Sequence, residues 1–195
     1  STRMENAEKG LVAFNGVPLI QHVLTEMLID CTHVAISCNS HQKEYAHILS
    51  HAIDASSKAV QVSPRLIGKD GLIEDQCTPI AGPVAGIISS VIEIEKSALF
   101  DQHQLKRGTI LVTSCDMPLL VNQQYKKLVN LAQKKPNLAH YFASTTTEQQ
   151  KSPHHFLPAA FNIERAMQLA NQWQQLPKHT PRSNFALKNW HSAVS

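Results

Sequence analysis

Three groups of polar side chains each follow an apolar segment of the chain, and their types suit the binding of a cation and a polar ligand. The groups are Ser37 with Asn39, Glu74 with Asp75, and Asp116. Carboxylates are hard oxygen donors that hold divalent cations, and hydroxyl and amide groups hydrogen-bond polar ligands. If these groups meet in space, they form a site for a divalent cation and a polar ligand.

The apolar segments before these groups are predicted to be strands. Residues 33–38 and 72–73 read as strands, and residues 109–113 form the clearest one, continuous and rich in β-branched side chains. That pattern is typical of a central parallel strand covered on both faces. Because ligands of α/β proteins bind outside the carboxyl ends of parallel strands, we expect the three polar groups to converge there.

Helices alternate with these strands. Apolar residues at helical spacing predict helices over 18–29, 84–95, 122–134 and 163–175, and a short one over 42–49. Residues 52–70 read as an irregular insertion, with one strand at 59–62. Further strands are predicted over 138–143, 156–161 and 183–187, and Pro158 favours an edge position or a bulge for the second of these. The alternation predicts a three-layer α/β domain with a mainly parallel sheet.

Length and composition fit one domain over residues 1–195. The chain is 43% hydrophobic, and 18 basic against 15 acidic residues give a net charge of +3, too small and scattered for a nucleic-acid binder. No apolar run is long enough to span a membrane, so no membrane partner is expected. The cysteines lack CxxC spacing, so we expect free thiols at Cys31, Cys38, Cys77 and Cys115. Trp173 and Trp190 are expected to pack on surface helices.

Four segments, taken together, resemble one family. They are Ser1-Thr2-Arg3-Met4 with Lys9-Gly10-Leu11 and Asn15-Gly16-Val17-Pro18-Leu19-Ile20; Ile36-Ser37-Cys38-Asn39; Glu74-Asp75 with Gly82-Pro83-Val84-Ala85-Gly86-Ile87; and Ser114-Cys115-Asp116-Met117-Pro118-Leu119-Leu120. In this order and spacing they resemble the molybdenum cofactor guanylyltransferases, of the Rossmann-like nucleotidyltransferase superfamily. The resemblance runs from Ser1 to about Asn162. The stretch from Gly82 to Ile87 is more similar to the guanylyl branch than to the cytidylyl branch.

The resemblance implies a reaction and its partners. The family moves GMP from GTP onto the terminal phosphate of molybdopterin, with Mg²⁺, and releases pyrophosphate. This implies a bacterial cytoplasmic protein whose further partners include molybdoenzyme maturation proteins. Two alternatives stay open: a related cytidylyl or sugar-phosphate nucleotidyltransferase, and a nucleotide-binding maturation protein without catalysis.

The resemblance also implies three catalytic roles. Asp116 matches the family's Mg²⁺ ligand, and Lys9 matches the lysine that reaches the phosphates. Arg3 lies in the phosphate loop, where a guanidinium can make forked contacts to phosphate. Attacker, phosphorus centre and leaving group all carry negative charge, so the reaction needs such cations.

The nucleotide site is implied at two strand ends. Asp75 matches a family residue whose oxygens could accept from guanine N1–H and N2–H₂ or from the ribose hydroxyls. Ser37 lies where the family contacts the nucleotide, and Asn39 could serve instead. Gly82 and Gly86 flank a helix start, where close backbone approach and free N–H groups favour anions.

The chain departs from the family pattern at both ends. The family's first strand and its glycine-rich phosphate loop would lie immediately upstream of Ser1, and we expect them to precede this sequence. Near the other end, an Asn-x-Asn-Thr-Pro run is reduced to Asn189, with Leu187 at the other Asn position. That run helps to handle the pterin, so acceptor recognition is the least determined part of the resemblance.

Overall fold

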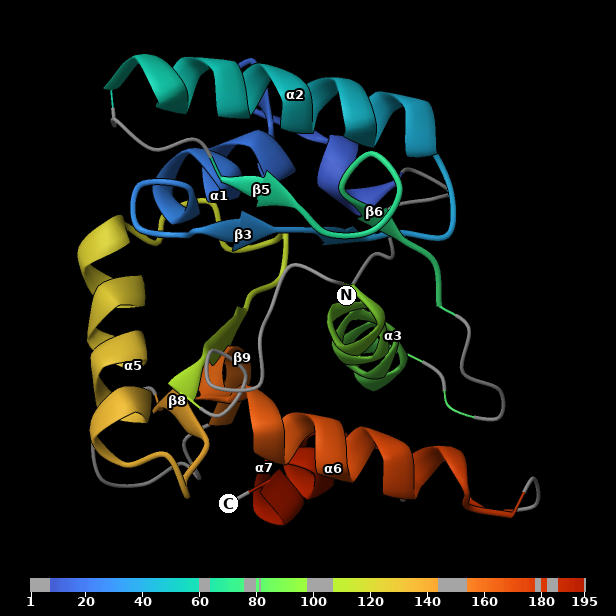
Figure 1. Ribbon diagram of the computed structural model, residues 1–195. Helices are drawn as coiled ribbons and strands as arrows, with labels where there is room; N and C mark the ends of the chain where they lie inside the picture. The colour runs from blue at the N-terminus through green and yellow to red at the C-terminus, as the bar shows by residue number, and fades with distance from the viewer. Residues whose placement is uncertain are drawn as a thin grey trace, which may run out of the picture.

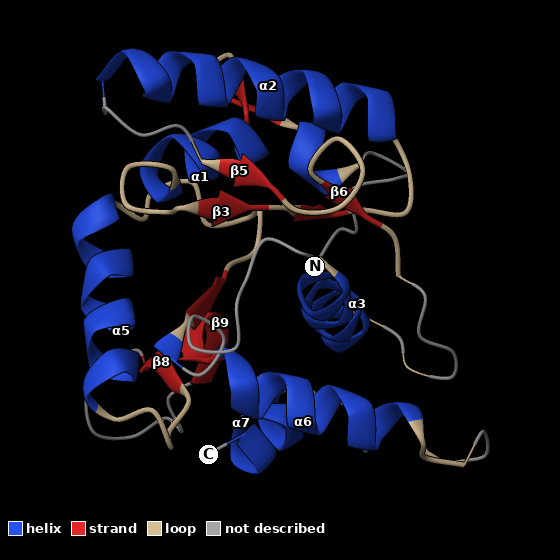
Figure 2. Cartoon of the chain, viewed as in Figure 1, coloured by secondary structure: helices blue, strands red, loops and turns tan. Residues whose placement is uncertain are grey.

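Helices and strands alternate along the chain in a computed structural model that describes residues 8–59, 64–75, 80, 82–97, 107–143, 154–177, 180–181 and 186–194. Figures 1 and 2 show their arrangement. The helices are η1 (Lys9–Leu11), α1 (Leu19–Met27), α2 (Gln42–Ala59), α3 (Pro83–Lys96), α5 (Asn122–Lys134), α6 (Ile163–Gln174) and α7 (Leu187–Val194). The strands are β1 (Ala13–Phe14), β2 (Val17–Pro18), β3 (His33–Val34), β4 (Ile36–Ser37), β5 (Arg65–Leu66), β6 (Leu72–Ile73), β7 (Thr109–Val112), β8 (His140–Ala143) and β9 (His154–Asn162).

The predicted layers are present. Helices α1 and α2 lie on one side of the β3–β5 and β4–β6 pairs, and α3 lies on the other, with α6 and α7 beyond it (Figure 1). The α1–α2 layer closes one apolar cluster around Val34, Ile36 and Leu49. The α3–α6–α7 layer closes a larger one around Ile88, Val91 and Trp190. The α/β class and the three layers are therefore confirmed.

The described strands pair in both directions. β3 runs parallel to β5, and β4 runs parallel to β6, as expected for strands joined by helical crossovers. The three-stranded sheet has the order β7-β9-β8, and β9 is antiparallel to both neighbours. The described partner of β7 is thus an antiparallel strand, where the sequence indicated parallel neighbours.

Pro158 lies in the middle strand of that sheet, and of the two alternatives expected for it, an edge position or a bulge, the structure shows the second. The β8–β9 register shifts between Tyr141 and Ala143, and the Leu157–Pro158 peptide is cis. Successive residues of β9 then face opposite layers. Ala160 packs toward α5, whereas Ala159 and Phe161 pack toward the α3–α6–α7 layer.

Two helix predictions need correction. α2 runs from Gln42 to Ala59, ten residues beyond the expected end, because Tyr45, Leu49 and Ala52 continue its buried face. Residues 52–59 are therefore helix rather than insertion, and β5 is a strand the sequence did not predict. Leu187 begins α7 instead of ending a strand. Of the other expected strands, residues 60–62 and 183–185 lie outside the described residues, and Ala59 ends α2.

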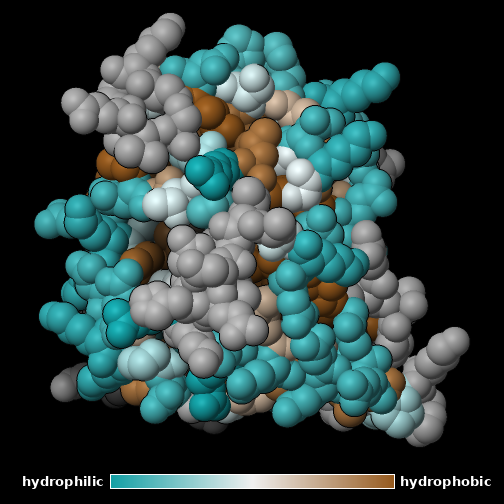
Figure 3. All heavy atoms as spheres, viewed as in Figure 1, coloured by the Kyte–Doolittle hydropathy of each residue, from teal (hydrophilic) through white to brown (hydrophobic). Residues whose placement is uncertain are grey.

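Hydrophilic side chains gather at the surface, and the large hydrophobic ones are mostly buried. Figure 3 shows a mainly hydrophilic face with separate hydrophobic patches. Trp190 is fully buried and meets Trp173 edge to face at 5.3 Å between ring centroids, so it packs in the main core, more deeply than expected. Within the described residues, no helix has both the length and the apolar character needed to cross a membrane.

Candidate functional site

Lys9 and Asp116 form an ion pair at the carboxyl end of β7. Lys9 lies in η1, near the beginning of the described chain, and Asp116 lies in the loop after β7. The Lys9 ammonium donates a hydrogen bond to Asp116 Oδ2. The Lys9 side chain remains 57% exposed and the Asp116 side chain 38% exposed. A cation and a carboxylate that stay open to solvent can both reach a bound ligand.

The charges of this pair support each other. Burial alone would raise the pKa of Asp116, but hydrogen bonds from Lys9 and Ser114 outweigh it and hold the pKa below its usual value. The hydrogen bond to Asp116 likewise raises the pKa of Lys9. At neutral pH the site therefore presents one full positive and one full negative charge.

The loop that carries Asp116 is fixed at its far end by α1. The backbone N–H of Asn122, the first residue of α5, donates to Glu26 Oε2 at 2.7 Å, and Asn122 Nδ2 donates to the Glu26 carbonyl at 3.1 Å. A carboxylate at a helix N-terminus is favourable because the helix dipole is positive there. Strand β7 and this contact together restrict where Asp116 can lie.

Ser37, Asn39 and Asp75 form the second polar cluster, at the ends of the parallel strands β4 and β6. Ser37 Oγ donates to Asp75 Oδ1 at 3.1 Å, and Asn39 Nδ2 donates to Asp75 Oδ2 at 3.0 Å. The backbone N–H of Asp75 donates to Asn39 Oδ1 at 2.9 Å. The three predicted residues are thus joined directly, and each Asp75 oxygen keeps a lone pair for a further donor.

The first turn of α3 lies against this cluster. A Cβ added at Gly86 would lie 2.5 Å from Ser37 Oγ and 3.4 Å from Asp75 Oδ1, so only glycine fits without a shift. Gly82, the N-cap of α3, has φ of 74°, a conformation that glycine adopts without strain. Gly86 thus lets α3 pack closely on Ser37 and Asp75, and the expected approach of an anion to the two glycines stays a prediction.

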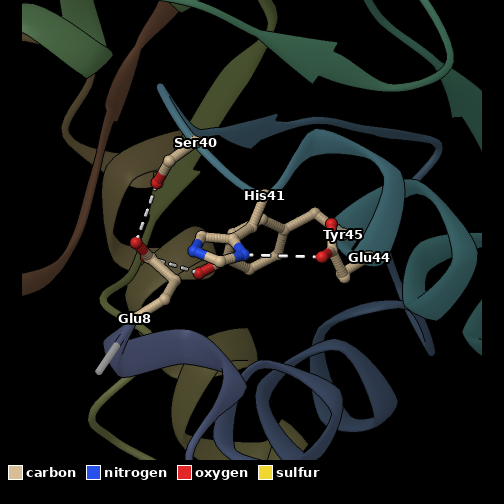
Figure 4. A network of polar contacts seen from close by, with 5 residues as sticks. All are labelled: Glu8, Ser40, His41, Glu44 and Tyr45. Atoms are coloured by element: carbon tan, nitrogen blue, oxygen red, sulfur yellow. Dashed lines mark hydrogen bonds and ion pairs between the residues drawn. The ribbon is translucent and has the colours of Figure 1, made fainter. Parts of the chain in front are cut away.

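A carboxylate that the sequence did not single out lies next to Lys9. Glu8 Oε1 accepts from the Tyr45 hydroxyl at 2.8 Å, and Glu8 Oε2 accepts from Ser40 Oγ at 2.9 Å (Figure 4). Its acidic type beside Lys9 was the only signal, since Tyr45 is 37 residues away. Cys38 lies near Glu8 and near Asp75. Burial raises the pKa of its thiol, and the negative charges of Glu8, Glu74 and Asp75 raise it further.

The other residues that the sequence singled out join neither the Lys9–Asp116 pair nor the cluster around Asp75. Glu74 accepts a hydrogen bond from Gln42, and Arg3 lies outside the described residues. Cys31, Cys38 and Cys115 are free, as predicted, while Cys77 also lies outside that part. Among the described residues no three His, Cys, Asp or Glu side chains gather as metal ligands. The one exposed carboxylate at β7 instead suits Mg²⁺, which takes one or two carboxylates and otherwise waters and phosphate oxygens.

The fold and this arrangement are those of a Rossmann-like nucleotidyltransferase domain, and comparison with known proteins agrees. A family model described as the MobA-like NTP transferase domain matches residues 1–182. The molybdenum cofactor guanylyltransferase of Pseudomonas entomophila is 29% identical over 133 residues, which is 67% of this chain and 52% of that protein. The protein of the same name from Burkholderia cenocepacia is 31% identical over 120 residues, 62% of this chain and 45% of that protein.

The chain belongs to the MobA-like NTP transferase domain family, since the match covers most of its length. It spans about half the length of the curated relatives it matches. The residues matched include the Lys9–Asp116 pair and the cluster of Ser37, Asn39 and Asp75.

Proposed function

We propose that this protein transfers GMP from GTP to the terminal phosphate of molybdopterin. The observation that carries the proposal is the pairing of Lys9 with Asp116 at the end of β7, in a family whose named relatives are molybdenum cofactor guanylyltransferases. An oxygen of the pterin phosphate attacks the α-phosphorus of GTP, the bond to the bridging oxygen breaks, and pyrophosphate leaves. The bacterial cytoplasm and contacts with maturation proteins belong to the same proposal.

Lys9 and Asp116 supply the charge that this transfer needs. Lys9 neutralises phosphate oxygens and orients the leaving pyrophosphate, because its exposed ammonium stays protonated. Asp116, ionised at neutral pH, is the residue that would hold Mg²⁺. When bound there, Mg²⁺ would offset the negative charge that develops on the transferred phosphate. Arg3 is proposed as a second phosphate contact.

Ser37, Asn39 and Asp75 are proposed to hold the nucleoside. Ser37 and Asn39 fix both oxygens of Asp75, so its carboxylate has one orientation before the ligand arrives. Its remaining lone pairs can accept from N1–H and N2–H₂ of guanine, or from the ribose hydroxyls. Cytosine has no comparable pair of donors on that edge, which favours GTP over CTP.

Thermal unfolding of the full chain with Mg²⁺ and GTP, CTP or ATP tests the base preference. A nucleotide at 100 times its dissociation constant stabilises a protein by about 2.7 kcal/mol. We expect this stabilisation, seen as a higher unfolding temperature, with GTP alone. Asp75→Ala should abolish it. A rise with CTP alone would support the cytidylyl alternative. A rise with GTP but no formation of the guanine dinucleotide from molybdopterin would support a binding protein without catalysis.

A further inference from the structure

The carboxylate of Glu8 ties η1 to α2 and to the loop after β4. It accepts one hydrogen bond from Tyr45, in the first turns of α2, and one from Ser40, just before that helix (Figure 4). The Glu8 carbonyl also accepts from the Leu11 N–H at 3.0 Å, which closes the turn of η1. Glu8 is therefore held through both its side chain and its backbone.

Tyr45 provides a firm base for this contact. Its side chain is only 4% exposed and packs with Leu49 and Cys38 in the α1–α2 layer. Burial raises the pKa of Tyr45 above its usual range, and the hydrogen bond to Glu8 raises it further. The hydroxyl therefore stays protonated and donates to Glu8. A Cβ at Gly10 would overlap that hydroxyl, which means that the backbone of η1 lies directly on the ring.

Lys9 lies between these two fixed positions. Glu8 is bonded to Tyr45 on one side, and Gly10 contacts the same ring on the other. Lys9 itself is exposed, so packing does not position its long side chain. Ser40 directly follows Asn39, so the Glu8 carboxylate also connects η1 to the cluster around Asp75.

We propose that Glu8 is a positioning residue, which Tyr45 and Ser40 hold so that the Lys9 ammonium meets Asp116. Only the kinetic part of the proposal rests on the proposed function. The geometric part requires that the Lys9–Asp116 contact weaken when the bonds to Glu8 are removed, whatever the protein catalyses.

Tyr45→Phe and Ser40→Ala test the geometric part because each removes a donor to Glu8 without changing the charge near Lys9. The readout is the yield of the amide crosslink between Lys9 and Asp116 that a carbodiimide forms at pH 7, measured by mass spectrometry. Only an ammonium and a carboxylate in direct contact are joined in this way, so a Lys9 that leaves Asp116 should lower the yield at least about threefold. Ser40→Thr, which keeps the hydroxyl, should retain the original yield.

Glu8→Gln and Glu44→Gln form a matched pair of charge controls. Glu44 lies on α2, where it is exposed and contacts His41 at 3.5 Å (Figure 4). Glu8→Gln should lower the crosslink yield, whereas Glu44→Gln should leave it unchanged. Adding Tyr45→Phe to Glu8→Ala should produce no further decrease, because Glu8→Ala already removes the acceptor of the Tyr45 hydroxyl.

The kinetic arm measures kcat/KM for GTP. Tyr45→Phe and Glu8→Gln should lower it about tenfold to a hundredfold, the scale of an ångström-sized displacement of a catalytic group. An unchanged yield of the Lys9–Asp116 crosslink in folded Tyr45→Phe and Ser40→Ala overturns the positioning role. A lowered yield with no transfer by the unmodified protein would keep that role and remove the proposed function instead. Ser40 is exposed, so Ser40→Ala gives the answer even if a Tyr45 or Glu8 variant fails to fold.

Discussion

Lys9 and Asp116 lie 107 positions apart in the sequence and form an ion pair whose exposure nearly equals that of a second pair, Lys126 with Asp30. The first pair is 57% and 38% exposed, and the second is 57% and 43% exposed. Exposed ion pairs each stabilise a fold by about 0.2–1 kcal/mol. The two pairs should therefore contribute similarly to stability. If removing the first pair lowers activity more than removing the second, the excess reflects a role of Lys9 and Asp116 in the reaction.

Asp116→Asn should abolish transfer while the fold remains intact. The amide keeps the size of the side chain but loses the charge that would hold Mg²⁺ and pair with Lys9. We expect kcat for GMP transfer to fall by at least about a hundredfold. Asp30→Asn is the matched control and should keep full activity. Equal activity in both variants would contradict the assignment of Asp116.

Lys9→Ala should weaken GTP binding and slow transfer, because one cation that faces the phosphates is lost. An increase in KM and a decrease in kcat, each about tenfold, are expected in steady-state assays. Lys126→Ala, which removes an equally exposed ammonium from α5, should change neither. Unchanged kinetics for Lys9→Ala would make Lys9 a surface residue.

The ion pair also predicts how stability depends on pH. The lowered pKa of Asp116 stabilises the fold above the ordinary value of 3.8, and this contribution is lost as pH falls through the lowered pKa. The raised pKa of Lys9 stabilises the fold below 10.5, and this is lost as pH rises through the raised pKa. In urea unfolding, the deficit of Asp116→Asn should stay constant between about pH 5 and 9 and shrink toward both extremes. A deficit that peaks at either extreme would contradict the pairing.

Local patterns predicted the site better than its surroundings. Ser37 ends β4, Asn39 and Asp75 follow β4 and β6 closely, and the carboxyl ends of these two parallel strands converge by geometry alone. Asp116 follows β7, whose apolar run is also visible in the sequence. The resemblance assigned Lys9 and Asp116 to one catalytic site, but their direct contact was not predicted, because nothing local relates two residues 107 positions apart. Glu8 was missed for the same reason, since its partners belong to another helix and loop.

The errors in the fold have similar causes. The end of α2 was misjudged because its second half is rich in Ser, His and Asp, and only tertiary burial of Ala52 shows that the helix continues. Pro158 left an edge position and a bulge open, and the sequence could not choose between them; the irregular β8–β9 register accommodates a residue without an N–H inside the sheet.

Trp190→Ala should be the most destabilising single change in α7. The indole is fully buried and contacts Phe161 and Trp173. Removing a buried Trp costs about 3–5 kcal/mol, which lowers the Tm of a domain of this size by roughly 6–20 °C. Trp173→Ala should cost less, because Trp173 is only half-buried on α6. Calorimetry of both variants checks the order, and a larger loss for Trp173→Ala would contradict the central place of Trp190 in the core.

Gly86→Ala should separate nucleotide affinity from stability. A methyl group there would lie 2.5 Å from Ser37 Oγ, so the hydroxyl must rotate away from Asp75. The same change favours the helix, since alanine is better than glycine by about 1 kcal/mol in a helix interior. We therefore expect a nearly unchanged Tm without ligand and a smaller increase of Tm with GTP, equivalent to about a tenfold loss of affinity.

The double variant Ser37→Ala/Gly86→Ala shows whether the clash causes that loss. Ser37→Ala already lacks the hydroxyl that Gly86→Ala would displace, so the second change should reduce GTP affinity much less in this background than alone. Additive losses would mean that Gly86 acts on the nucleotide directly, through close approach of the α3 backbone to its phosphates. A loss in neither variant would mean that Ser37, Asp75 and the first turn of α3 do not form the nucleotide site.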